Sequence, residues 1–167
     1  MIICYTGMGK GKTSACLGQA LRALGHGYSV CFCQFIKRDH QSGEQSMLKR
    51  LLGDRFLANG VGMVSQAKDR SEHKKRAQQV LLFAHQHIPT TWLLILDELC
   101  VALSFGLIDT QACIDLLTFA RSQHCHVIVS GRKAPPWLCA MADCVTVMEN
   151  EKHPFQKGEK ALKGIDY

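Results

Sequence analysis

Short apolar runs recur along the chain and alternate with segments of helical periodicity. The apolar runs predict buried strands at residues 2–5, 28–35, 92–96, 126–130 and 144–148. Apolar positions at helical spacing, together with capping residues, predict helices at residues 13–24, 44–52, 70–87, 109–120 and, briefly, 135–143. Strands that are apolar on both faces and alternate with helices are typical of a mainly parallel sheet covered by helices on both faces. The predicted fold class is therefore α/β.

Two stretches follow neither pattern. Residues 57–66, LANGVGMVSQ, carry Gly60 and Gly62 on either side of Val61 and predict a loop. Residues 150–167 are polar and predict an irregular C-terminal tail. The sequence contains no internal repeat, low-complexity stretch or linker, so residues 1–167 are expected to form a single domain.

Length and composition limit the class of protein. A chain of 167 residues is long enough to bury one substantial core. Hydrophobic residues make up 47% and charged residues 20%, which excludes a disordered or fibrous protein. No apolar run approaches the roughly 20 residues that a membrane span needs. The first residues also lack the basic region and cleavage site of a signal peptide, so we expect a cytoplasmic protein.

Charge and cysteine content limit the kinds of ligand and cross-link that we expect. The net charge of +6 suits either nucleic acid or a polyphosphate ligand. The basic run at residues 73–76 has few aromatic residues near it and indicates a solvated helix face, so no nucleic acid partner is expected. Nine cysteines are an odd number without a CxxC pair, which favours buried apolar thiols over disulfides or a zinc ribbon.

The segment TGMGKGKT, residues 6–13, joins the first predicted strand to the first predicted helix. The P-loop consensus is G-x-x-x-x-G-K-S/T, and here Thr6 occupies the slot of the first glycine while Gly7 comes one place later. A helix N-terminus attracts phosphate, Lys12 adds a point charge, and the hydroxyl of Thr13 can complete the shell of Mg²⁺. The predicted ATP-binding residues of this loop are Thr6, Gly7, Met8, Gly9, Lys10, Gly11, Lys12, Thr13 and Ser14.

The run LLILDE places Asp97 and Glu98 at the end of a predicted strand. In an open parallel sheet this end faces the same crevice as the phosphate loop, so either carboxylate can reach a metal ion bound to Thr13. Lys37 and Arg132 follow two other strands, and these two further cations suit a whole triphosphate. The same residues could orient water for hydrolysis or simply hold Mg²⁺, so a P-loop ATPase or nucleotide kinase remains an alternative.

Seven segments together resemble the ATP:corrinoid adenosyltransferases of the cobalamin-synthesis and salvage type. In chain order they are TGMGKGKT (6–13), LRALGHG (21–27), QFIK (34–37), LDE (96–98), SGR (130–132), ADCVT (142–146) and KHPFQKGEKALKGIDY (152–167). They cover nearly the whole chain, and the shifted phosphate loop is itself a feature of that family. The resemblance implies a RecA-like P-loop fold that is usually a homodimer.

The resemblance also implies a reaction. A reduced Co(I) corrinoid attacks the 5′ carbon of ATP, takes the 5′-deoxyadenosyl group and releases triphosphate. Mg²⁺ would be the cofactor, and Lys12, Thr13 and Glu98 would be the catalytic residues, with Lys10 and Arg132 helping to neutralise the triphosphate. The cobalt is the nucleophile, so no protein nucleophile or general base is required. A flavoprotein would be the electron donor.

Two features depart from the family pattern. The family carries two aromatic residues that pack beneath the corrin and displace its lower ligand, whereas the corresponding stretch here holds Val61 and Met63. Both are still predicted to bind the corrinoid by excluding water. Many relatives also have a short N-terminal extension, and this chain begins at its first predicted strand. A non-catalytic ATP- or corrinoid-binding relative is therefore a second alternative.

Overall fold

The computed structural model describes residues 1–67 and 69–167. Its centre is a six-stranded sheet in the order β3-β2-β4-β5-β1-β6, and every neighbouring pair of strands is parallel. The strands are β1 (Ile2–Thr6), β2 (Val30–Gln34), β3 (Phe56–Ala58), β4 (Leu93–Asp97), β5 (His126–Ser130) and β6 (Cys144–Val147). This arrangement confirms the predicted fold class.

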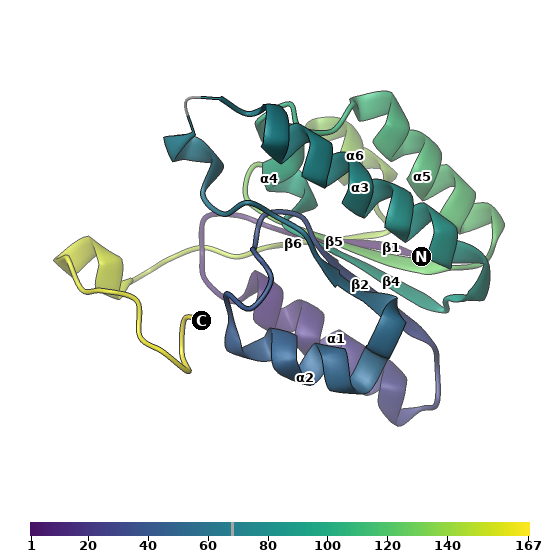
Figure 1. Cartoon of the computed structure of the whole chain (residues 1–167), viewed down its shortest axis with the longest axis horizontal. Coiled ribbons are helices and arrows are strands. Elements are labelled where there is room, and N and C mark those ends of the chain that lie inside the picture. Colours follow the sequence, from purple (N-terminus) through teal and green to yellow (C-terminus); the bar gives the residue numbers. More distant parts are fainter. Residues whose placement is uncertain (68) are drawn as a thin grey trace.

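Helices cover both faces of the sheet. They are α1 (Lys12–Gly25), α2 (Gly43–Leu52), α3 (Ser71–His87), α4 (Leu99–Ser104), α5 (Thr110–Ser122) and α6 (Pro136–Met141). Figure 1 shows α1 and α2 on one side of the sheet and α3, α4, α5 and α6 on the other. Short 3-10 turns are η1 (Gly53–Arg55), η2 (Val64–Gln66), η3 (Ile88–Thr90) and η4 (Pro154–Lys157).

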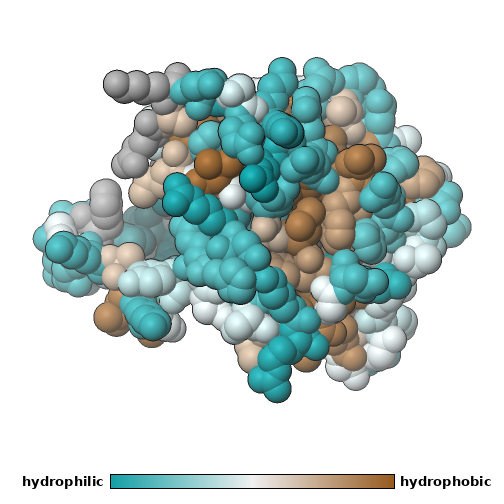
Figure 2. Space-filling model, viewed as in Figure 1, coloured by the Kyte–Doolittle hydropathy of each residue, from teal (hydrophilic) through white to brown (hydrophobic). Residues whose placement is uncertain are grey.

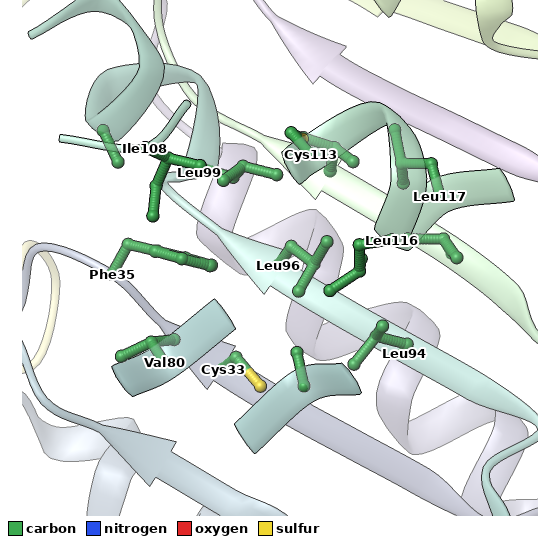
Figure 3. Close-up of a cluster of buried hydrophobic side chains, with 14 of the residues drawn as sticks. Cys33, Phe35, Val80, Leu94, Leu96, Leu99, Ile108, Cys113, Leu116 and Leu117 are labelled. Carbon is green, nitrogen blue, oxygen red and sulfur yellow. The ribbon is translucent and has the colours of Figure 1, made fainter. Parts of the chain in front are cut away.

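The apolar strands are explained by two cores, one on each face of the sheet. Successive side chains of a strand point to opposite faces. Leu94 and Leu96 of β4 therefore pack with α3 and α5, whereas Leu93 and Ile95 pack with α1 and α2. Figure 3 shows the first core, where Leu96 lies beside Cys113 and Leu116 of α5, Val80 of α3 is opposite, and Cys33 of β2 lies nearby.

The structure differs from the sequence prediction in three short segments. Strand β3 lies partly inside the predicted loop, because three residues are too few to show a period. Helix α4 lies where the pattern predicts no element, since its six residues make less than two turns. The predicted strand at 28–35 begins later, at Val30. Tyr28 is instead exposed and stacks on Trp92, with 4.1 Å between the ring centroids.

After β6 the chain leaves the sheet as a tail that contains only the short turn η4 among its described elements. Figure 1 shows this tail looping outward before the C-terminus returns toward the end of the sheet from which α1 starts. The outer face seen in Figure 2 is largely hydrophilic, with apolar residues in patches between the polar ones. None of the helices in the described ranges is long and apolar enough to cross a membrane.

Candidate active site

The phosphate loop between β1 and α1 depends on glycine for two reasons. Gly7 and Gly11 have φ angles of 94° and 111°, in the left-handed region that favours glycine. Gly9 lies against the start of the tail, because its N–H donates to the carbonyl of Met148 at 2.7 Å. A Cβ atom on Gly9 would lie 2.7 Å from the carbonyl carbon of Met148. The glycine pattern therefore allows both the left-handed turns of the loop and its close packing against the tail.

Lys12 is the first residue of α1 and reaches back over the loop. Its ammonium donates to the carbonyl of Gly7 at 2.9 Å and also to the carbonyl of Gly9. Partial burial lowers the pKa of Lys12, and the nearby Arg132 guanidinium acts in the same direction. The ammonium is thus held at the mouth of the loop, where a phosphate bound by the helix N-terminus would meet it.

Asp97 is the fully buried centre of the hydrogen-bond network at the end of β4. Its Oδ1 atom accepts from the hydroxyl of Thr13 at 3.0 Å and from the hydroxyl of Ser130 at 2.6 Å. Its Oδ2 atom accepts from the amide of Gln34 at 3.2 Å. The carboxylate therefore fixes the first turn of α1 to the ends of β2, β4 and β5.

Glu98 follows Asp97 in the chain and has a positive φ angle of 63°, which is unusual for a residue other than glycine. Its backbone N–H donates to Ser130 Oγ at 3.0 Å. Burial, followed by the neighbouring charge of Asp97, raises the pKa of Glu98 to about 7. Its Oε2 atom is buried, and no side chain or backbone group in the described ranges hydrogen bonds to it. This carboxylate oxygen, which has no partner among the described residues, lies in the same cleft as Thr13 and next to the Asp97 carboxylate, and these groups fit the oxygen donor set that Mg²⁺ prefers.

A second network holds Lys37 at the cleft. Its ammonium lies 2.7 Å from Glu44 Oε1 and 3.8 Å from Asp97 Oδ2. Although burial opposes the charge, Asp97 and Glu44 raise the pKa of Lys37, and Lys37 in turn lowers the pKa of Glu44 to about 2 against the effect of burial. Gln34 donates to Glu44 Oε1 at 3.2 Å and accepts from the buried Gln45 amide at 2.8 Å. These residues connect α2 to Asp97.

Sequence reasoning did not assign Glu44, Gln34 or Gln45 to the site. One signal was available, because Gln34 is a polar residue in a strand that is otherwise apolar and fully buried. Buried amides need partners, so a polar network at the end of this strand could be expected. The identity of those partners depends on where α2 packs, which the local sequence does not specify.

These groups border a cleft of about 1080 Å³ at the carboxyl ends of the strands. Its lining includes the loop from Met8 to Ser14 together with the charged residues Lys37, Glu98 and Arg132. It also includes apolar side chains from several elements: Leu17, Ile36, Met47, Met63, Val64, Val101 and Phe105. Three methionines at the cleft, Met8, Met47 and Met63, are 53%, 49% and 66% exposed. Exposed thioether side chains can adapt to a large apolar ligand.

Most of the predicted site residues lie together at this cleft. Thr6 and Gly7 lie beneath it, and the Thr6 hydroxyl accepts from the N–H of Ala134 at 3.2 Å. Asp97 lies behind Glu98 and Thr13. The remaining predicted ATP-binding residues line the cleft: Met8, Gly9, Lys10, Gly11, Lys12, Thr13, Ser14, Lys37 and Arg132.

The two predicted corrinoid contacts are separated. Met63 lines the main cleft, whereas Val61 lines a smaller hollow of about 270 Å³ that also includes Arg38 and Arg76. The carbonyl of Val61 accepts a hydrogen bond from the Arg38 guanidinium. Val61 and Met63 therefore border different spaces, although they are two positions apart in the chain.

A glycine loop between the first strand and first helix, linked by a hydroxyl to a carboxylate at the end of another parallel strand, defines a P-loop nucleotide-binding protein. The whole chain, residues 1–167, matches the sequence model of the family described as ATP:corrinoid adenosyltransferase BtuR/CobO/CobP, and the chain belongs to this family. Enzymes of the family transfer the adenosyl group of ATP to the cobalt of a corrinoid.

Similar proteins agree with this assignment. A corrinoid adenosyltransferase of Pseudomonas aeruginosa is 35% identical over 170 residues, which cover 100% of this chain and 83% of that protein. The corrinoid adenosyltransferase CobA of Salmonella typhimurium is 34% identical over 169 residues, covering 100% and 85% of the two chains. The resemblance stated from the sequence is therefore confirmed.

Solved structures show a similar fold at low sequence identity. The flagellar accessory protein FlaH of Methanocaldococcus jannaschii superposes with a TM-score of 0.58 at 16% identity, over 87% of this chain and 69% of that chain. The KaiC-like protein PH0186 of Pyrococcus horikoshii OT3 gives the same TM-score and identity over 91% and 74% of the two chains. Both comparisons support the RecA-like P-loop fold alone.

Proposed function

We propose that this chain transfers the 5′-deoxyadenosyl group of ATP to the Co(I) centre of a reduced corrinoid and releases intact triphosphate. One observation carries the proposal: the lining of a single cleft contains the phosphate loop together with apolar side chains, among them exposed methionines. The loop suits the triphosphate of ATP, and the apolar side chains suit a flat macrocycle. The two reactants would then meet within one cavity.

In this reaction the cobalt forms a bond to the 5′ carbon of ATP, and the bond from that carbon to the 5′ oxygen breaks. The bonding electron pair leaves with the oxygen, so negative charge grows on the triphosphate. Lys10, Lys12, Lys37 and Arg132 all reach the cleft and are placed to stabilise that charge. Lys37 would approach the triphosphate from the α2 side, where Glu44 holds its side chain.

Thr13, Asp97 and Glu98 are the residues that would hold Mg²⁺. The unpartnered Oε2 atom of Glu98 and the hydroxyl of Thr13 are the donors that fit the ion best. When bound, the ion would supply positive charge to the triphosphate oxygens. Asp97 would orient Thr13 through the hydrogen bond that joins them, and Ser130 would fix Asp97 from the other side.

The apolar side of the cleft would exclude water from the reacting cobalt. Of the two residues predicted to bind the corrinoid, Met63 is the one that we place against its lower face, with Val61 supporting the same loop from behind.

The proposal includes a homodimer, a flavoprotein electron donor and a cytoplasmic location. The edge strand β6 supports a homodimer, because all four of its residues are exposed. Its outer edge also offers backbone groups for pairing with a second chain. The nine cysteines support a cytoplasmic location, because all are thiols and most are buried, which suits a reducing compartment. The electron donor is inferred from the reaction, which needs cobalt to be reduced to Co(I).

Phosphorus NMR of a reaction with chemically reduced cobalamin tests the proposal. We expect triphosphate to accumulate in step with adenosylcobalamin. Orthophosphate or ADP from the outset, without alkylated corrinoid, would instead identify an ATPase or a nucleotide kinase. Binding of ATP and corrinoid without any product would identify a non-catalytic relative.

A further inference from the structure

The last six residues form a self-contained turn, which we call the C-terminal turn (residues 162–167). Two hydrogen bonds join Asp166 to Leu162 across the turn. The Oδ2 atom of Asp166 accepts from the N–H of Leu162 at 2.7 Å, and the N–H of Asp166 donates to the carbonyl of Leu162 at 2.8 Å. The N–H of Gly164 donates to the carbonyl of Tyr167 at 2.8 Å. The turn therefore keeps its shape through its own hydrogen bonds.

The C-terminal turn lies at the mouth of the cleft. Gly164, Ile165, Asp166 and Tyr167 belong to the cleft lining, and the carboxylate of Asp166 forms an ion pair with the ammonium of Lys10 in the phosphate loop. The beginning of the tail is bound to the same loop, because Asn150 Oδ1 accepts from the N–H of Lys10 at 3.2 Å. The tail thus starts and ends at the phosphate loop.

The turn itself is held weakly. All of its residues are exposed, and its apolar side chains Leu162 and Ile165 remain 62% and 67% exposed. In the part of the chain that the structure describes, its other hydrogen bonds join its own residues, and the neighbouring charge of His153 also acts on Asp166. Ion pairs in contact with water contribute little to stability. Little buried surface and charge contacts that are exposed to water are the features of an element that opens easily.

A triphosphate would compete with Asp166 for Lys10. It carries several negative charges, and phosphate oxygens form strong charge-assisted hydrogen bonds with an ammonium group. Once triphosphate occupies the loop, the carboxylate of Asp166 also faces like charge at short range. Both effects favour exchange of the Asp166 carboxylate for a phosphate oxygen at Lys10.

We infer that the C-terminal turn is an electrostatic latch, which Asp166 closes on Lys10 in the nucleotide-free protein and which a bound triphosphate group opens. Opening widens the mouth of the cleft after ATP has bound, when the larger corrinoid has to enter. The identity of the second ligand rests on the proposed function, whereas the latch itself needs only a triphosphate in the phosphate loop.

Limited trypsin digestion of the full chain tests the latch, because Lys160 and Lys163 flank the start of the turn. Cleavage at these two lysines is followed by mass spectrometry with and without Mg²⁺ and inorganic tripolyphosphate. We expect tripolyphosphate to accelerate cleavage of the wild-type protein several-fold. Asp166→Asn keeps an acceptor oxygen for Leu162 but loses the charge, so it should be cleaved fast even without tripolyphosphate. Glu159→Gln, the same charge change in the same tail, should behave as wild type.

Calorimetry supplies a second measurement on the same variants. Removing the competing carboxylate should make Asp166→Asn bind tripolyphosphate roughly two- to fivefold more tightly, because more of the protein is already open. Slower cleavage of the wild-type tail in the presence of tripolyphosphate would overturn the latch and indicate a lid that closes on its ligand. Unchanged cleavage in Asp166→Asn would overturn it as well. If tripolyphosphate opens the turn but no corrinoid is alkylated, the latch stands and the proposed function fails.

Discussion

The hydroxyl of Thr13 lies 3.0 Å from Oδ1 of Asp97, although 84 residues separate the two in the chain. The contact arises because β5 lies between β1 and β4 in the sheet, so the loop after β1 and the end of β4 open into one crevice. This hydrogen bond attaches the first turn of α1, directly after the phosphate loop, to the buried carboxylate of Asp97.

Lys12→Ala should weaken binding of Mg·ATP. The variant loses a charge-assisted contact to phosphate, which corresponds to a roughly ten- to hundredfold higher Kd. Titration calorimetry measures the effect, and Lys75→Ala on the exposed face of α3 is the matched control. Equal affinities of wild type and Lys12→Ala would show that the glycine loop does not bind the triphosphate.

Thr13→Val should raise the Mg²⁺ concentration required for half-maximal activity. Valine has nearly the shape of threonine but lacks the hydroxyl that joins Asp97 and would contact the ion. Thr13→Ser keeps the hydroxyl and should retain most of the wild-type Mg²⁺ dependence. The measurement is the initial rate of adenosylcobalamin formation over a series of Mg²⁺ concentrations at saturating ATP. A valine variant with an unchanged Mg²⁺ requirement would remove Thr13 from the metal site.

Glu98→Gln should stabilise the Mg²⁺-free protein at alkaline pH. The pKa of Glu98 is about 7 in the folded protein, against 4.5 for an unperturbed glutamate. Between these values the folded state keeps a proton that the unfolded state has lost, so the wild-type free energy of unfolding decreases as pH rises through this window. Above the folded pKa the full cost of the buried charge is present, and glutamine avoids it.

Differential scanning calorimetry in the presence of a chelator, at two pH values, measures the effect of Glu98→Gln on stability. Near pH 8 we expect the melting temperature of Glu98→Gln to exceed that of wild type by a few degrees. Near pH 5 the difference should shrink, because most of the wild-type carboxyl is then protonated. A variant that is less stable than wild type at both pH values would mean that the Glu98 carboxylate has a stabilising partner in the folded protein.

Met63→Trp should accelerate the reaction when Co(II) cobalamin is supplied with a mild flavin-based reductant. Met63 lies on the cleft wall, and a planar ring there can stack on the corrin and exclude its lower base, which a flexible thioether does less well. Val61→Phe alone should have little effect, because Val61 lines the smaller hollow. The double variant should match Met63→Trp.

The same variants assayed with Co(I), produced by a strong chemical reductant, provide the control. All should then react at similar rates, since reduction is no longer limiting. Cobinamide lacks the lower base and should be handled well even by the wild-type protein. Wild-type protein that is equally fast in the Co(II) and Co(I) assays would show that Met63 does not form the lower-face wall.

The sequence was sufficient for the features that are encoded locally. The phosphate loop is one contiguous segment, so the place of Gly7, Lys12 and Thr13 between the first strand and the first helix could be predicted from their spacing alone. Asp97 and Glu98 end an apolar run, and a parallel sheet brings the ends of its strands to one edge. The same reasoning placed Lys37 and Arg132 at the cleft, where the structure has them.

Features that depend on packing between distant segments could not be predicted. Glu44 reaches Lys37 only because α2 packs beside β2, and nothing near residue 44 specifies that contact. Strand β3 is too short for periodicity and forms by pairing with β2. The return of the tail depends on single contacts such as the ion pair of Asp166 with Lys10. These contacts are set by tertiary structure rather than by local pattern.

The fate of the 5′ carbon of ATP distinguishes adenosyl transfer from phosphate transfer. The wild-type protein is supplied with Mg²⁺, ATP labelled with ¹³C at the 5′ position, and cobalamin reduced to Co(I). We expect ¹³C NMR to show the label in adenosylcobalamin, on the carbon bonded to cobalt, with triphosphate as the other product. Label that remains in ATP, ADP or free adenosine while phosphate is released would show that the protein does not transfer the adenosyl group.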